Sequence, residues 1–123
     1  MDKVENYSQT QVSGLGQAEL ESRALIRTAG ALNAIKENWD QRREDLDEAL
    51  EKNRKLWAIF AAAMHEEDCP LPSELRANIL NLSMFVFQRT LDIQEAPEPQ
   101  KLDVLININM NIAKGLVGNI EDK

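Results

Sequence analysis

One stretch constrains the fold more than any other: the core-type positions between residues 46 and 64 recur at alternating steps of four and three. They are Leu46, Leu50, Asn53, Trp57, Phe60 and Met64. Because an α-helix completes a turn in about 3.6 residues, this spacing puts all of them on one face. The stretch predicts a long helix, over about residues 40–65, that packs along the seam of a helical bundle.

Three more segments show helical periodicity. The segment of about residues 17–38, with Trp39 directly after it, places Leu25, Leu32, Ile35 and Trp39 on one side together with Ala24 and Ala31. A helix over residues 73–93 is separated from its neighbours by two pairs of prolines, and its short connection to the preceding helix predicts an antiparallel pair. A fourth helix spans about residues 98–116, and Gly115 and Gly118 are expected to end it. Its inner face carries Leu102, Leu105, Ile106, Asn109, Ile112 and Leu116.

These segments predict an all-α fold, a small bundle of about four helices with a flexible N-terminal arm. No stretch alternates polar and apolar residues as a strand would. Residues 1–16 are polar and include Gly14 and Gly16, so we interpret them as the arm. Residues 17–123 then form the single helical domain.

The composition narrows the function classes. The chain has 123 residues, 43% apolar, with no run long enough to span a membrane and no secretory signal at the start. Its single cysteine, Cys69, excludes an internal disulfide. We therefore expect a cytoplasmic protein without membrane contact. A net charge of −7, with Lys and Arg dispersed among acids, argues against direct nucleic-acid binding.

The residues that enzymes use are sparse. The only histidine, His65, and Cys69 both lie beside Glu66, Glu67 and Asp68, where His65 fits a solvent-facing cation and Cys69 makes a poor nucleophile. No phosphate-binding loop or metal-ligand spacing is present. We expect no catalytic residues, no metal and no cofactor.

The third helix is apolar on two nearly opposite sides. One stripe consists of Leu75, Ile79, Leu82, Val86 and Ile93, and the other of Leu80, Met84, Phe87 and Leu91. The helix is therefore either central in the bundle, or it packs into the core with one stripe and offers the other as a groove for a partner helix. We assign the stripe from Leu75 to Val86 to the core, with Trp57 and Phe60. The stripe from Leu80 to Leu91 is assigned to the partner groove.

Two amides interrupt apolar seams. Asn53 and Asn109 would each cost about 1–3 kcal/mol if buried without partners, so each should form hydrogen bonds, with the other or with backbone carbonyls. They either fix the register of the bundle or orient a partner's backbone at a groove.

The sequence resembles the flagellar biosynthesis regulator FlaF family of alphaproteobacteria. The matching stretches are "YSQTQ", "AELESRALIRTAGAL", "DLDEALEKNRKLWAIF", "LPSELRANILNLSMFV" and "LININMNIAKGL", and together they cover most of the chain. The most specific signal is an ordered set: Asn53, Arg54, Leu56, Trp57, Leu71, Pro72, Leu75, Arg76, Ile79, Leu82, Ser83, Leu105, Ile106, Asn109, Gly115 and Leu116.

The resemblance implies a small cytoplasmic factor for bacterial flagellum biogenesis. It implies a flagellin-binding secretion chaperone and regulator that couples flagellin synthesis to export during filament assembly, with flagellin as direct protein partner. A flagellin-regulatory protein is a further possible partner. Two alternatives stay open: a post-transcriptional regulator of flagellin messenger RNA that acts with a partner protein, and a purely structural helical adaptor.

Overall fold

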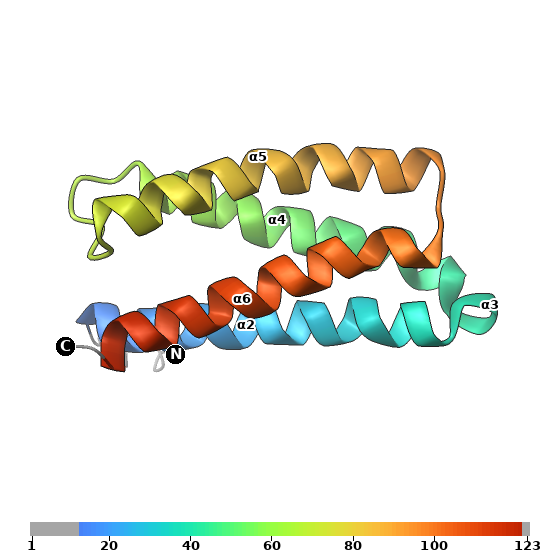
Figure 1. Cartoon of the computed structure of the whole chain (residues 1–123), viewed down its shortest axis with the longest axis horizontal. Coiled ribbons are helices and arrows are strands. Elements are labelled where there is room, and N and C mark those ends of the chain that lie inside the picture. Colours follow the sequence, from blue (N-terminus) through green and yellow to red (C-terminus); the bar gives the residue numbers. More distant parts are fainter. Residues whose placement is uncertain (1–12, 122–123) are drawn as a thin grey trace, which may run out of the picture.

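The protein, seen in a computed structural model that describes residues 13–121, consists of four long helices joined by short connections (Figure 1). The long helices are α2 (Ser13–Glu37), α4 (Leu46–Met64), α5 (Ser73–Glu95) and α6 (Leu102–Glu121). A short helix, α3 (Trp39–Arg42), and two 3₁₀ turns, η1 (Arg43–Asp45) and η2 (Pro99–Lys101), lie in the connections. Residues 13–121 contain no strand, and the predicted all-α bundle of about four helices is confirmed.

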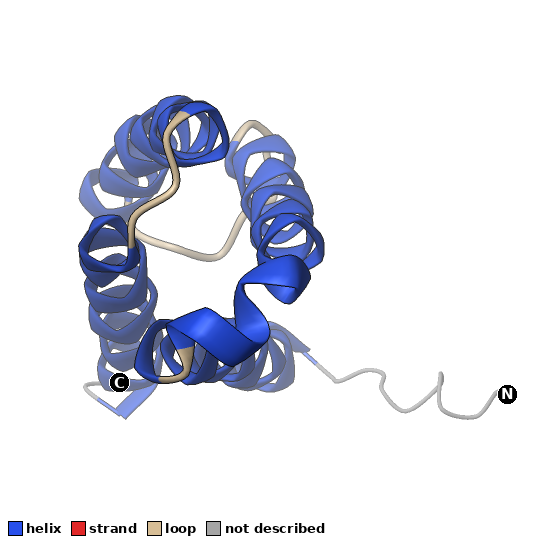
Figure 2. Ribbon diagram, turned by 90° about the vertical axis from the view of Figure 1, so that its right-hand side faces the viewer, coloured by secondary structure: helices blue, strands red, loops and turns tan. Residues whose placement is uncertain are grey.

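The four long helices form a ring around a common core. Seen along the bundle axis in Figure 2, their order is α2, α4, α5 and α6, so α4 faces α6 across the centre. The closest pairs are α2 with α6 and α4 with α5, whereas α5 and α6 touch least among the four neighbouring pairs. The bundle is therefore two tightly packed pairs with one loose edge.

Large apolar side chains from all four long helices fill the centre. The fully buried set includes Leu25, Leu32, Leu50, Trp57, Ile79, Val86, Ile93, Leu102, Leu105 and Leu116. The ring of Trp57 meets that of Phe60 edge to face at 5.6 Å. Each buried side chain of this size contributes about 1.5–3 kcal/mol, so this core supplies the main driving force for folding.

Small residues explain the closeness of α2 and α6. Ala18, Ser22 and Ala29 of α2 and Ala113 of α6 are all buried. The Ser22 hydroxyl donates a hydrogen bond to the Ala113 carbonyl oxygen at 3.1 Å, which requires the two backbones to approach closely. Small side chains permit that approach because they keep little volume between the helices.

The connection between α4 and α5 is held by one arginine. The Arg76 guanidinium donates to the carbonyl oxygens of Met64, at 2.9 Å, and Glu66, at 3.3 Å. The Met64 carbonyl belongs to the last turn of α4, where helix geometry leaves it without an intrahelical donor. The Glu66 carbonyl lies in the connection and also accepts from the Cys69 N–H at 3.2 Å. Arg76 thereby fixes the antiparallel hairpin that the two prolines at 70 and 72 predicted.

The second predicted helix is shorter than expected. The sequence placed its start near Asp40, but α4 begins at Leu46, after α3 and η1. Trp39 gives the physical reason: its half-buried ring packs against the core, and Arg43 lies over it with its guanidinium carbon 5.4 Å from the ring centroid. The chain turns around this anchor before the long helix starts.

Both terminal helices are longer than predicted. Gly115 and Gly118 do not end α6, which continues to Glu121. A helical glycine costs only about 1 kcal/mol relative to alanine, and the buried Leu116 between them offsets that cost. Likewise α2 starts at Ser13, so residues 13–16 of the expected arm are helical, while its residues 1–12 lie outside the described region.

Within residues 13–121, no helix combines the length and the apolar character needed to cross a lipid bilayer.

Candidate partner-binding surface

The two apolar stripes predicted on α5 are each divided between core and surface. In the stripe assigned to the core, Ile79 and Val86 are buried, whereas Leu75 and Leu82 are only half-buried. In the stripe assigned to a groove, Leu80 and Phe87 are half-buried against the core, and Met84 and Leu91 are exposed.

Polar residues complete the inner face of α5. The buried line runs through Ile79, Ser83, Val86, Thr90 and Ile93, again at steps of four and three. The Ser83 and Thr90 hydroxyls donate to the carbonyl oxygens four residues earlier, at 2.8 and 2.7 Å. Because these bonds satisfy the hydroxyls within α5, the two residues can occupy core positions that the apolar pattern assigned to Leu75 and Leu82.

The outer surface of α5 carries two strongly exposed apolar side chains, and Ile59 on the neighbouring α4 is exposed to a similar degree. Met84 is 68% exposed and Leu91 is 66% exposed. Leu91 lines a shallow hollow with Phe85, Gln88, Arg89, Asp92 and Glu95, and the Arg89 guanidinium carbon lies 5.4 Å from the Phe85 ring centroid. Exposed apolar side chains next to a hollow are a feature of protein-binding surfaces.

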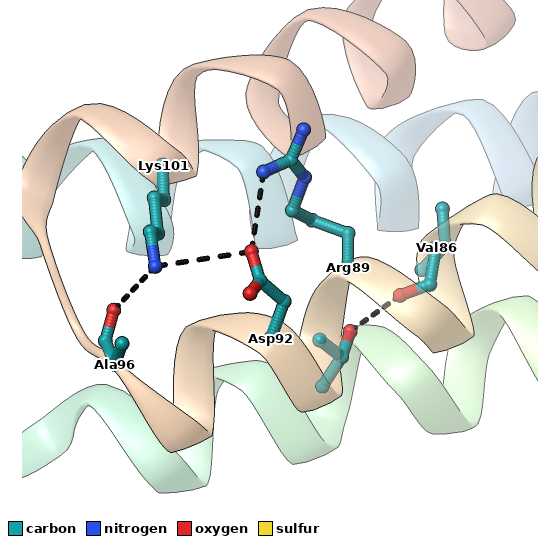
Figure 3. A network of polar contacts seen from close by, with 6 residues as sticks. Val86, Arg89, Asp92, Ala96 and Lys101 are labelled. Atoms are coloured by element: carbon teal, nitrogen blue, oxygen red, sulfur yellow. Dashed lines mark hydrogen bonds and ion pairs between the residues drawn. The ribbon is translucent and has the colours of Figure 1, made fainter.

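A cluster of ion pairs closes the turn between α5 and α6 (Figure 3). Oδ2 of Asp92 lies 3.4 Å from an Arg89 nitrogen and 3.8 Å from Nζ of Lys101. Nζ of Lys101 also donates to the Ala96 carbonyl oxygen at 2.7 Å. This cluster, which we call the α5–α6 clasp, joins the two helices at one end of their loose edge.

The two amides meet in the middle of the bundle. Nε1 of Trp57 donates to Oδ1 of Asn109 at 2.9 Å, and Nδ2 of Asn109 donates to Oδ1 of Asn53 and Oγ1 of Thr28, both at 2.8 Å. These hydrogen bonds link α4 to α6 across the centre of the bundle, and they also link α6 to α2. Asn109 is therefore the hub of a polar network at the centre of the core.

The donors in this network fix the orientation of both amides. An indole nitrogen can only donate, so the oxygen of Asn109 faces Trp57 and its nitrogen faces Asn53. Asn53 must then present its oxygen to Asn109. Its own Nδ2 is buried and has no hydrogen-bond partner among the described residues. An unpaired buried donor of this kind costs about 1–3 kcal/mol.

Shifted pKa values occur away from α5. A hydrogen bond from Arg54 lowers the pKa of Glu51, and the same contact raises the pKa of Arg54. A hydrogen bond to Asp103, with Nζ 2.8 Å from its Oδ1, raises the pKa of Lys36. The first pair lies on α4 and the second joins α2 to α6, so the electrostatics of these groups concern helix stability.

The sequence interpretation missed three residues of these sites. Thr28, a partner of Asn109, was not considered because it lies on the first helix between apolar positions. Phe85 and Arg89 belong to neither apolar stripe, yet they line the hollow beside Leu91. The four-residue spacing of Phe85 and Arg89 could have indicated their contact, because residues four apart in a helix are neighbours.

The exposed His65 and the half-buried Cys69 lie in or beside the α4–α5 connection.

The sequence matches the family described as flagellar protein FlaF over residues 3–116. The chain belongs to the FlaF family. This confirms the resemblance noted in the sequence and makes the chain a flagellar protein. The surface of α5 and the network around Asn109 both lie inside the part of this FlaF chain that carries the match. Neither a curated protein nor a solved structure is similar enough to the chain to count as a match.

Proposed function

We propose that this FlaF protein is a flagellin-binding secretion chaperone and regulator that couples flagellin synthesis to export during filament assembly. It binds flagellin directly in the cytoplasm, and it catalyses no reaction. A flagellin-regulatory protein is a second partner, and through this protein the binding of flagellin affects flagellin synthesis. Family membership supports the flagellar context of this proposal.

The observation that carries the proposal is the exposed apolar surface of α5. A chaperone for a self-assembling helical subunit has to cover apolar helix faces that would otherwise associate. Met84 and Leu91 offer such a surface, and a thioether side chain adapts its shape to different partners. The net charge of −7 favours solubility of the resulting complex.

Titration calorimetry with unpolymerised flagellin tests the proposal. We expect a dissociation constant of about 1 μM or tighter, which corresponds to roughly −8 kcal/mol. Replacing Met84 or Leu91 by alanine should weaken binding at least about tenfold, because truncation of a central apolar contact has effects of that size.

Leu20→Ala is the matched control. Leu20 is also exposed, at 58%, but it lies on α2, diagonally across the bundle from α5. Its substitution should leave binding unchanged. If purified flagellin gives no heat and no co-elution well above the micromolar range, the protein is not a flagellin chaperone.

A further inference from the structure

The middle sections of α5 and α6 carry no charge. Residues 77–88 and 104–113 contain no Asp, Glu, Lys, Arg or His, although 28% of the chain is charged. The exposed polar residues in these runs are amides: Asn78, Asn81 and Gln88 on α5, and Asn107 and Asn111 on α6. Depletion of charge distinguishes the centre of a protein interface from ordinary protein surface.

The two uncharged runs lie on neighbouring helices along the loose edge of the bundle. The clasp shows which sides of these helices face each other, because Asp92 of α5 meets Lys101, the last residue of η2, directly before α6. Phe85 precedes Asp92 by two helical turns, and Ile108 follows Lys101 by two turns, so both lie on the facing sides. The edge beyond the clasp is thus bordered by apolar side chains.

The apolar side chains along this edge are incompletely covered. Leu75, Leu82 and Ile108 are half-buried against the core, and Phe85 is 38% exposed. From residue 75 to residue 89 the edge measures on the order of 20 Å, at about 1.5 Å per residue. That length accommodates about four turns of a partner helix. We call this surface, with its flanking amides, the α5–α6 edge.

We propose that the α5–α6 edge binds an amphipathic helix of a partner protein whose contacting face is apolar and bordered by uncharged Asn, Gln, Ser or Thr. A charged side chain placed there would lose hydration and find no opposite charge between the clasp and the far end of the edge. Amide side chains on the rim both donate and accept hydrogen bonds, so they match amides and hydroxyls on the partner.

The identity of the partner as flagellin rests on the proposed function, whereas the surface and the chemistry of its occupant do not. Met84 and Leu91 alone offer little area, and a specific complex buries about 1,000 Å² or more in total. The α5–α6 edge supplies the additional area. Leu82 on the edge and the exposed Met84 and Leu91 lie on nearly opposite sides of α5, so the edge is a second contact area beside that of Met84 and Leu91.

The experiment introduces charge into the edge without disturbing the core. Asn78→Asp combined with Asn111→Asp places two carboxylates at exposed positions, and Asn33→Asp combined with Gln41→Glu, on α2 and α3, is the control that adds the same charge away from the edge. Each protein is titrated with unpolymerised flagellin. Each is also titrated with a synthetic helical peptide of about sixteen residues that has an apolar stripe and only Asn, Gln and Ser beside it. A twin peptide carries Glu and Lys at those flanking positions.

We expect the double variant to bind flagellin and the uncharged peptide at least about tenfold more weakly than the unchanged protein, and the control to bind both equally well. The uncharged peptide should shift the backbone amide resonances of Leu82, Phe85 and Ile108, and the twin should not. Circular dichroism and melting temperature of the double variant should match those of the control.

Three results would overturn the inference. The first is normal flagellin binding by the double variant together with loss of binding by Met84→Asp, which leaves the proposed function intact and places the contact elsewhere. The second is binding of the charged twin as tight as that of the uncharged peptide. The third is a dimer of the unchanged protein that the double variant does not form, so that a second copy occupies the edge. Conversely, if the peptide binds at the edge and flagellin does not bind at all, the edge stands and the chaperone proposal fails.

Discussion

Asn53 and Asn109 should respond in opposite ways to replacement by leucine. The sequence treats them alike, since both are amides on apolar seams. In the structure Asn109 accepts from Trp57 and donates to Asn53 and Thr28, whereas Asn53 only accepts one bond and leaves its own nitrogen unpaired. Replacement of Asn109 and replacement of Asn53 therefore leave different buried groups without hydrogen-bond partners.

Asn109→Leu strands two buried groups, the indole N–H of Trp57 and the amide of Asn53. At about 1–3 kcal/mol each the loss is about 2–6 kcal/mol, and the added apolar burial of leucine recovers about 1.5–3 kcal/mol. The net cost should be near 2 kcal/mol. Asn53→Leu removes one bond, worth about 1 kcal/mol, together with an unpaired donor that costs about 1–3 kcal/mol, and Asn109 keeps its bond to Thr28. This variant should match the unchanged protein or exceed its stability.

Urea denaturation and thermal melting followed by circular dichroism measure the difference. The free energies of unfolding of the two variants should differ by at least about 2 kcal/mol, and their melting temperatures by on the order of 8 °C. Trp57→Phe supplies an internal check, because it removes the stranded N–H and should cost less in the Asn109→Leu background than alone. Equal stability of the two leucine variants, within about 0.5 kcal/mol, would refute the assignment of Asn109 as the hub. Flagellin binding should persist in both variants, since the amides are buried.

Ile79→Ala should lower the free energy of unfolding by about 2–5 kcal/mol because it leaves a cavity at a buried position, whereas Leu91→Ala should lower it by less than about 1.5 kcal/mol. Equal losses for the two variants in urea titrations would contradict the division of α5 into an inner and an outer face. The pH dependence of stability should reveal the bond between Lys36 and Asp103. Because that bond raises the pKa of Lys36, its contribution is complete below the ordinary pKa of a lysine side chain and is lost as pH rises through the raised pKa of the folded protein. Melting temperatures of the unchanged protein and Lys36→Met should therefore converge at strongly alkaline pH, and a constant difference up to that range would disprove the pairing.

The order of the helices and their boundaries near prolines could be predicted from the sequence, because proline acts locally. Pro70 and Pro72 prevent helix continuation whatever surrounds them, and α5 begins at Ser73, directly after Pro72, although α4 already ends at Met64, six residues before Pro70. Boundaries set by tertiary contacts could not be predicted. The turn at α3 depends on the half-buried ring of Trp39, and the extension of α6 past Gly115 and Gly118 depends on the burial of Leu116.

The candidate surface was only partly predictable for a related reason. A helical wheel separates the sides of α5, but it cannot say that Ser83 and Thr90 satisfy their hydroxyls internally and so occupy the inner face. Once they do, Leu75 and Leu82 are left half-buried at the edge toward α6. The seam positions of Asn53 and Asn109 predicted their burial. The direction of their hydrogen bonds could not be predicted from the sequence, because it depends on the N–H of the Trp57 indole, which donates to Asn109.

The position of the polar network bears on how the α5–α6 edge could accept a helix. Among the described residues the network joins α2, α4 and α6, while the core hydroxyls of α5 bond to its own backbone. Within residues 13–121, side-chain hydrogen bonds and ion pairs fix α5 to other segments near its ends, through Arg76 and through the clasp at Asp92. A partner helix that enters the edge between these two points displaces apolar contacts of Leu82 and Ile108 and leaves the side-chain hydrogen bonds and ion pairs of the described residues in place. Binding there costs little reorganisation, because the hub at Asn109 keeps the other three long helices in register while the middle of α5 adjusts.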